Sequence, residues 1–193
     1  MNVNKAIIKQ NKSLKRVLFF NCFIFVSAIL LFIFFPQMVM GVKAILMGLI
    51  MVSLVFMTSK VEENYLKYKI VKSRMYIKTG IMDSTTVVRS DKVAIVHTEN
   101  SKKEMKIIIV SSCKGKRRNF KSADSNIFGK NKKLNNYFKK IKNKNCNLRF
   151  FYTEIVNGGY NKYKLLNDIY IYCEEAFFSD DAIDNIKLYK NIE

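Results

Sequence analysis

Two long apolar runs open the chain and predict a pair of membrane-spanning helices. Residues 17–35 read VLFFNCFIFVSAILLFIFF, nineteen residues without a charge, and as a helix they would span about 28 Å, close to the hydrocarbon thickness of a bilayer. A second run covers residues 38–57 and holds one charge, Lys43. Because only Pro36-Gln37 separates the two runs, we expect an antiparallel transmembrane hairpin over residues 17–59.

The residues inside this hairpin exclude two classes of protein segment. A secretory signal peptide has a shorter apolar stretch and a small-residue cleavage site, whereas the first run ends in Phe34-Phe35. No charged pair marks an ion path, so we expect neither a channel nor a transporter. Asn21 and Ser27 are predicted to hydrogen-bond across the hairpin. Gly41 and Gly48, seven residues apart, either line a packing face between the helices or reflect ordinary composition.

Alternation with a period of two begins after the second run and predicts a β-rich domain. Leu66, Tyr68 and Ile70 alternate with lysines, as in a half-buried strand. The run MKIIIV is continuously apolar and predicts a strand buried on both faces. The predicted strands cover residues 66–70, 74–78, 85–89, 93–97 and 105–110, and residues 116–120 would add one edge strand.

A helical period follows the predicted strands. Apolar residues recur three and four positions apart and would share one face of a helix, with Ser122, Asp124 and Ser125 as candidate N-caps. This face is formed by Ile127, Leu134, Tyr137, Phe138 and Ile141, and the opposite face by Lys132, Lys133, Lys139, Lys140 and Lys144.

Several short strands followed by one amphipathic helix resemble the bacterial pleckstrin-homology-like domains. The residues that carry the resemblance are Tyr68-Lys69-Ile70, the run from Met75 to Ile81 (MYIKTGI) and the run from Thr86 to Val93 (TVVRSDKV). They look like that family's strand ending in glycine, followed by a strand and a lysine–valine step. In one such family the domain directly follows a transmembrane hairpin. The resemblance covers roughly residues 65–141 and implies a seven-stranded antiparallel barrel closed by a helix, without enzymatic activity.

The last 48 residues contain further predicted elements. Residues 148–156 are mostly apolar and aromatic, Asn157-Gly158-Gly159 predicts a tight hairpin turn, and residues 160–166 would form the returning strand. Residues 168–178 predict another strand, and Ser179 would cap a short helix that begins with Asp180-Asp181. So short a segment rarely folds alone, so we expect it to dock on the preceding domain.

The fold class expected is therefore a membrane α-hairpin followed by a cytoplasmic α+β part. Its β-domain would be a pleckstrin-homology-like antiparallel barrel or sandwich closed by the amphipathic helix, with a further β-hairpin and a short helix after it. The expected segments are a basic N-terminus (1–16), the hairpin (17–59), the β-domain with its closing helix (60–145) and the C-terminal extension (146–193).

Charge is distributed unevenly along the chain. The 193 residues contain 34 Lys plus Arg and 15 Asp plus Glu, a formal net charge of +19. Residues 114–149 hold thirteen basic residues and only Asp124, whereas residues 150–193 carry a net −4. Basic residues are retained on the cytoplasmic side of a membrane. Since they flank the hairpin on both outer sides, we expect a multi-pass protein of the inner (cytoplasmic) membrane with both termini in the cytoplasm.

Residues typical of catalysis or cofactor binding do not form a recognisable pattern. The single histidine, His97, is interpreted as a polar residue near a strand end, and an enzyme would need an organised polar pocket around it. The four cysteines (Cys22, Cys113, Cys146 and Cys173) lack zinc-ligand spacing and are expected to be free thiols. No glycine-rich phosphate loop occurs. We therefore expect no catalytic residue, no metal and no cofactor.

The basic block is the remaining candidate site. It would bind anionic lipid head groups or another polyanion through Lys114, Lys116, Arg117, Arg118, Lys121, Lys132, Lys133, Lys139 and Lys140. The expected function is that of a non-enzymatic membrane protein whose cytoplasmic domain binds a partner protein or anionic head groups. The alternative is an accessory membrane component of a DNA-transfer or other nucleic-acid-handling complex. That alternative is less favoured because no aromatic stacking platform or reading motif accompanies the charges.

Overall fold

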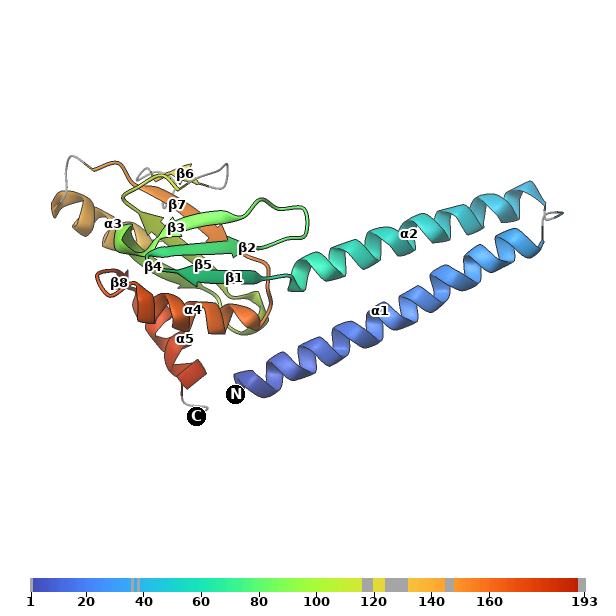
Figure 1. Cartoon of the computed structure of the whole chain (residues 1–193), viewed down its shortest axis with the longest axis horizontal. Helices are drawn as coiled ribbons and strands as arrows, with labels where there is room; N and C mark the ends of the chain where they lie inside the picture. Colours follow the sequence, from blue (N-terminus) through green and yellow to red (C-terminus); the bar gives the residue numbers. More distant parts are fainter. Residues whose placement is uncertain are drawn as a thin grey trace.

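A helical hairpin projects from an α+β domain in the computed structural model (Figure 1). The structure describes residues 2–35, 37, 39–115, 120–123, 132–144 and 148–190, and the side chains of Lys132, Lys133 and Lys144 lie outside the described part. The hairpin consists of α1 (Val3–Phe34) and α2 (Met40–Asn64). Both helices are long and apolar enough to cross a membrane, and most of their apolar side chains are exposed. The two helices therefore indicate membrane association.

The contact between the two helices matches the sequence expectation in part. Asn21 donates through Nδ2 to the backbone oxygen of Ser53 at 3.0 Å, so the predicted cross-hairpin bond is confirmed for this residue. Ser27 instead donates to Ile24 O of its own helix. A Cβ atom added to Gly41 or Gly48 would meet nothing within 4 Å, so these glycines do not line a tight packing face.

Helix α1 begins much earlier than its apolar run and its first turns pack on the domain. Asn2 caps the helix by accepting from Lys5 N at 2.9 Å. Val3 is fully buried in the main core, and Ile7 packs against that core. The backbone N–H of Tyr160 donates to Gln10 Oε1 at 2.9 Å. The segment 1–16, expected only as a basic terminus, therefore contains a helix that is held against the domain.

Two sheets form the β part of the domain. The first contains β1 (Lys67–Val71), β2 (Arg74–Lys78) and β3 (Thr86–Arg89) as an antiparallel meander in chain order. The second has the order β6-β7-β5-β4-β8 and is antiparallel except for the β4–β8 pair. Its strands are β4 (Val93–Glu99), β5 (Lys106–Ser111), β6 (Lys121–Ser122), β7 (Phe151–Ile155) and β8 (Phe177–Phe178). Short 3₁₀ turns precede β4 (η1, Ser90–Lys92) and β5 (η2, Lys102–Glu104).

The five predicted strands before residue 111 are confirmed, but the expected barrel is wrong. In the described part of the chain, β1–β3 and the five-stranded sheet remain separate and no closed barrel forms. The five-stranded sheet recruits β7 and β8 from the C-terminal segment, and β7 pairs with β5 from Ile107↔Ile155 to Ser111↔Phe151. The edge of β5 is thus occupied by a strand that the barrel topology does not contain. Residues 116–119 of the predicted edge strand lie outside the described residues.

Both faces of the five-stranded sheet are covered, which explains the run of isoleucines in β5. Ile107 and Ile109 point into the main core, which also includes residues of β2, β3, α4 (Asn161–Tyr172) and α5 (Asp180–Lys190). Ile108 and Val110 point to the other face, where α3 (Lys132–Lys144) packs. The helix predicted to close a barrel instead covers the outer face of this sheet.

The predicted C-terminal hairpin is wrong, because the chain enters a helix after β7. Gly158 (φ +117°) and Gly159 (φ +53°) adopt left-handed conformations that redirect the chain from the end of β7 to the start of α4. Tyr163, Leu166 and Ile169 are buried with spacings of three residues, the period of a helix. The predicted strand over 168–178 is reduced to β8. The predicted helix capped by Ser179 is confirmed as α5, and the C-terminal segment docks on the sheet as expected.

Candidate functional site

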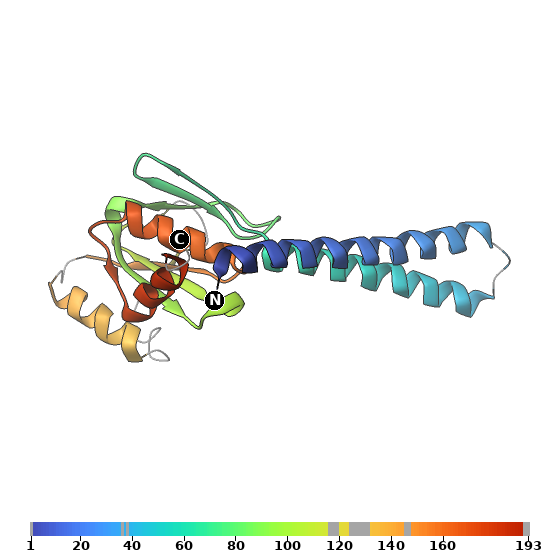
Figure 2. The same ribbon diagram turned by 90° about the horizontal axis from the view of Figure 1, so that it is seen from below.

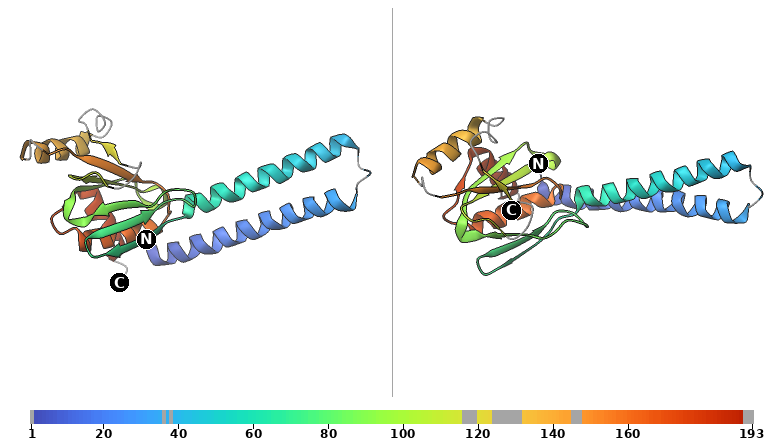
Figure 3. Two further views of the ribbon diagram at one scale, coloured as in Figure 1. Left: turned by 45° about the horizontal axis from the view of Figure 1, so that its top comes forward. Right: turned by 90° about the horizontal axis from the view of Figure 1, so that it is seen from above.

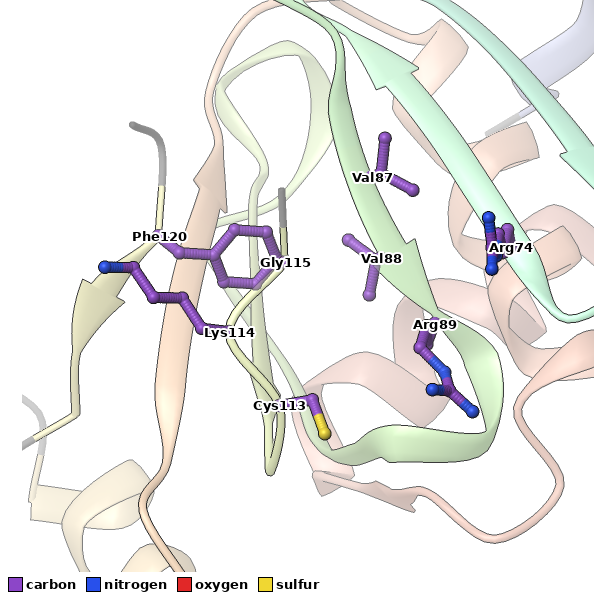
Figure 4. A pocket seen from close by; sticks show the side chains of 8 residues that line it. All are labelled: Arg74, Val87, Val88, Arg89, Cys113, Lys114, Gly115 and Phe120. Atoms are coloured by element: carbon purple, nitrogen blue, oxygen red, sulfur yellow. The ribbon is translucent and has the colours of Figure 1, made fainter. Parts of the chain in front are cut away.

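A small cationic pocket lies where the three-stranded sheet meets the loop after β5 (Figure 4). Its cavity volume is about 180 Å³. Arg74 comes from the start of β2 and Arg89 from the end of β3, while Cys113, Lys114 and Gly115 belong to the loop that follows β5. Val87, Val88 and Phe120 complete the lining. We call this set of residues the cationic pocket.

The two arginines lie directly opposite each other in the register of β2 and β3. Like charges at such cross-strand positions repel each other. Asp91 offsets the charge of Arg89, which donates to its carboxylate through Nε (3.2 Å) and Nη2 (2.8 Å). This side-chain hydrogen bonding lowers the pKa of Asp91. Arg74 forms no ion pair within the described residues. Arg74 and Lys114 therefore give the surroundings of this cavity an excess of positive charge.

Gly115 allows the Lys114 loop to approach the backbone of β3 closely. A Cβ atom at this position would lie 2.4 Å from Val87 O and 2.2 Å from the Phe120 ring. Since the first of these atoms belongs to the backbone of a strand, the loop would have to move away from β3. Glycine at position 115 thus fixes the distance between Lys114 and the arginine strands.

Replacing Gly115 by alanine is expected to destabilise the domain by about 1–3 kcal/mol, because the added methyl group overpacks a closed contact. The measurement is the urea midpoint of the full chain in detergent micelles, followed by tyrosine fluorescence. Gly48→Ala is the matched control, since a Cβ atom at Gly48 meets nothing within 4 Å. Equal midpoints for both variants would show that the Gly115 contact is not tight.

The basic residues predicted as a site fall into three groups. Lys114 is exposed at the cationic pocket, and its side chain runs away from the arginines toward β6, which carries exposed Lys121 (Figure 4). Lys139 and Lys140 are exposed on α3. Lys132 and Lys133 begin α3, but their side chains are not described, and Lys116, Arg117 and Arg118 lie outside the described residues.

Sequence reasoning missed Arg74 and Arg89, which the strand register adds to the site. The described cations of this region include Arg74, Arg89, Lys114, Lys121, Lys139 and Lys140, and we call these six the distal basic surface. The only available signal was that Arg74 begins one predicted strand and Arg89 ends another. Their proximity to Lys114 depends on how the sheet and the β5 loop meet.

The distal basic surface lies away from the helical hairpin. Helix α3 is at the end of the domain farthest from α1 and α2 in all views (Figures 1, 2 and 3). β1 starts at the end of α2 and runs away from it, so the β1–β2 turn beside Arg74 is also at the far end (Figure 1). The membrane-proximal end instead contains Tyr65, with Lys67 and Lys78 above its ring at 5.5 and 5.9 Å.

A histidine–serine pair, which no sequence pattern indicated, occurs in the core. His97 lies within β4 rather than near its end, 1% exposed, with Nδ1 2.8 Å from Oγ of fully buried Ser179. The same Oγ accepts from Ala182 N at 3.3 Å and so caps α5. Because both side chains are enclosed, we interpret this pair as a link between β4 and α5.

Two other groups have shifted pKa values because they are buried. Burial raises the pKa of the Cys173 thiol to about 12 and lowers that of Lys162 to about 8. Lys162 Nζ donates to the backbone oxygen of Val156, which gives this lysine a structural partner. Cys22, Cys113 and Cys173 are free thiols as expected, and the described residues form no cluster of metal-ligating side chains.

Comparisons with known proteins add no family to this picture. No protein-family model matches the chain, and no curated protein or solved structure matches it. The chain is thus described by two candidate membrane-spanning helices followed by an α+β domain with a three-stranded and a five-stranded sheet.

Proposed function

We propose that this protein is a non-enzymatic membrane-anchored interaction module whose distal basic surface binds an acidic protein partner in the cytoplasm. The observation that carries the proposal is that α3, with Lys139 and Lys140, and the β1–β2 turn, beside Arg74 and Arg89, lie at the end of the domain opposite to the hairpin (Figure 1). A cluster of lysines held near the leaflet would bind anionic lipids. Since the electrostatic attraction of exposed charges fades within about 10 Å at ordinary salt, lysines on the far side of the domain are better placed for a soluble partner.

The chemistry of the surface favours a carboxylate-bearing partner. Arg74 is without an ion pair in the described residues, and the adjacent cavity of about 180 Å³ suits one acidic side chain. Guanidinium groups bind carboxylates with two parallel hydrogen bonds. Two of the described aromatic residues of this region offer no free stacking face, because Phe120 is buried and Tyr137 packs on Phe177 and donates to Asp180. Single-stranded nucleic acid, which needs such faces, is therefore less favoured.

The hairpin is the anchor in this proposal. Its basic flanks orient both termini toward the cytoplasm, in accordance with the retention of Lys and Arg on that side. The start of α1 and the domain lie at the same end of the hairpin, which is compatible with a two-pass topology (Figure 1). The proposal depends on the distal basic surface and this anchor, and not on the resemblance to pleckstrin-homology-like domains.

The experiment uses the full chain in nanodiscs of zwitterionic phosphatidylcholine, so that no anionic lipid competes. Fluorescently labelled polyglutamate is expected to bind at low salt. The double variant Arg74→Glu/Lys114→Glu is expected to weaken this binding about tenfold or more, because two attractive charges become repulsive.

The matched control is Lys12→Glu/Lys15→Glu, which changes the net charge equally but on α1. Binding within about twofold of the unmodified chain is expected for this control. Equal weakening by both double variants would contradict a specific surface. Tighter binding of duplex DNA than of polyglutamate at matched charge would replace the acidic protein by nucleic acid as the partner.

A further inference from the structure

A second cavity lies at the root of the hairpin, between the first turns of α1, the last turn of α2 and the domain. Its volume is about 450 Å³. Lys9 of α1, Lys60 of α2 and Lys103 of the β4–β5 connection line it together with Gln10, Asn64 and Val17. We call it the root cavity. Its position is the level at which a phospholipid head group would meet a helix that leaves a bilayer at Val17.

The charges around the root cavity are not balanced. Glu63 is the carboxylate that pairs with its lysines, at 3.0 Å from Lys60 Nζ and 3.8 Å from Lys103 Nζ. Lys9 makes no ion pair within the part of the chain that the structure describes. Two of the three ammonium groups thus share one carboxylate and the third has no acidic partner among the described residues, and this arrangement favours an anion in the cavity.

Two amide side chains present unsatisfied polar atoms at the same place. Gln10 accepts from Tyr160 N through Oε1 at 2.9 Å, which leaves its Nε2 buried and without a partner. Asn64 donates through Nδ2 to Lys60 O at 2.9 Å, which leaves its Oδ1 buried and without a partner. Buried polar groups without partners are rare in native structures and call for an explanation such as a ligand. Gln10 and Asn64 both line the root cavity, so an enclosed donor and an enclosed acceptor without partners lie in its wall beside the three lysines.

An apolar groove between the two helices adjoins the root cavity at Val17. This groove has a volume of about 600 Å³ and is lined mainly by Val17, Phe20, Ile24, Leu49 and Phe56. Val17 lines both spaces, and Lys60 Nζ lies 5.8 Å from the centre of the Phe56 ring. The root cavity is basic and the adjacent groove is apolar. Together they match a lipid, whose charged head group would lie in the root cavity and whose acyl chain would lie in the groove.

We infer that the hairpin root binds one anionic phospholipid whose head group carries hydroxyl groups, as in phosphatidylglycerol. The phosphate accepts hydrogen bonds from the lysines and from Gln10 Nε2. A glycerol hydroxyl donates to Asn64 Oδ1, and one acyl chain follows the groove along Phe20 and Leu49. The inference rests on the membrane anchoring proposed above but not on the acidic partner. It is separate from the distal basic surface, which lies at the other end of the domain.

The test is native mass spectrometry of the full chain in detergent micelles, titrated with phosphatidylglycerol, phosphatidic acid or phosphatidylcholine. One tightly held phosphatidylglycerol molecule is expected, retained about tenfold more strongly than phosphatidylcholine. Lys9→Glu is expected to weaken retention about tenfold or more. Lys12→Glu, on the same helix but outside the root cavity, is the charge-matched control and is expected to stay within about twofold.

Three outcomes would overturn this inference or part of it. Equal losses for Lys9→Glu and Lys12→Glu would show that only general surface charge matters. Equal retention of phosphatidylcholine would refute an anionic site, and equal retention of phosphatidic acid would refute the hydroxyl contact with Asn64.

Leu49→Trp fills the groove and is expected to weaken retention of the lipid, whereas the control Met51→Trp, at an exposed position outside the groove, is expected to leave it unchanged. Alkaline extraction of membranes tests the anchoring separately, and a chain released into the supernatant would refute it.

Discussion

Replacing Gly158 by valine is expected to destabilise the domain by about 3–5 kcal/mol and to loosen it from the hairpin. Gly158 has φ +117°, a conformation that a β-branched residue does not tolerate. A Cβ atom there would also lie 2.7 Å from Cβ of Leu66. Gly158 N donates to Glu63 O at 2.9 Å and so ties the β7–α4 turn to the end of α2. Urea denaturation of the full chain in micelles measures the loss of stability, and hydrogen exchange of residues 60–66 measures the loosening.

Gly80→Ala is the matched control for this variant. A Cβ atom at Gly80 meets only the side chain of exposed Asp83, which can move aside, and the expected change is below about 1 kcal/mol. If Gly158→Val were as stable as Gly80→Ala, the turn between β7 and α4 would not hold the conformation described above.

Replacing Phe138 by alanine is expected to cost about 3–5 kcal/mol and to release α3 from the five-stranded sheet. Phe138 is fully buried and meets Phe150 edge-on, with ring centres 5.6 Å apart. Its neighbours Leu134, Ile108 and Val110 form the small core beneath the helix. The measurement is hydrogen exchange over residues 132–144 together with the urea midpoint.

Lys139→Ala is the control, since Lys139 is exposed on the same helix, and its expected effect is within about 0.5 kcal/mol. Loss of protection in α3 for Phe138→Ala but not for Lys139→Ala would support the helix orientation that exposes Lys139 and Lys140. Similar exchange in both variants would contradict the packing of Phe138 on the sheet.

The local periods of the sequence predicted those elements in which one face is buried and the other is not. Tyr68 and Ile70 alternate with lysines and lie in β1, and Leu134 and Phe138 recur at helical spacing and anchor α3. The isoleucines of β5 were predicted as buried on both faces, and the two cores on either side of the sheet confirm this.

The segment from Tyr160 to Phe178 was predicted wrongly because it satisfies two periods. Ile169, Ile171 and Cys173 alternate as in a strand, and its tyrosines favour strands. Ile169, Leu166 and Cys173 also lie three and four residues apart, and the main core buries this second set. β7 pairs with the remaining edge of β5, and the residues that follow it cover the sheet as helix α4.

The candidate sites required contacts between distant parts of the sequence. Lys114 was found because it begins a run of basic residues, but Arg74 and Arg89 join it only through strand register and the closeness that Gly115 permits. The root cavity combines Gln10, Asn64 and Lys103 from three separate regions. No local pattern distinguishes these side chains from other surface polar residues.

The orientation of the domain relative to the hairpin is the basis of the proposed function. Two attachments fix it, since α2 continues almost directly into β1 and the start of α1 is buried against the domain through Val3 and Gln10. With both attachments in place, we expect the domain to keep its distal basic surface away from the leaflet. This is the physical reason for assigning that surface to a soluble acidic partner.

Energy transfer from single positions of the domain to labelled lipid head groups tests this orientation most directly. A fluorescent amino acid would replace either Lys78, which lies beside Tyr65 at the end of α2, or Lys140 on α3, in the full chain in nanodiscs. Strong transfer from position 78 and weak transfer from position 140 are expected. Equal transfer from both positions, or stronger transfer from position 140, would place the basic surface against the bilayer and contradict the proposed function.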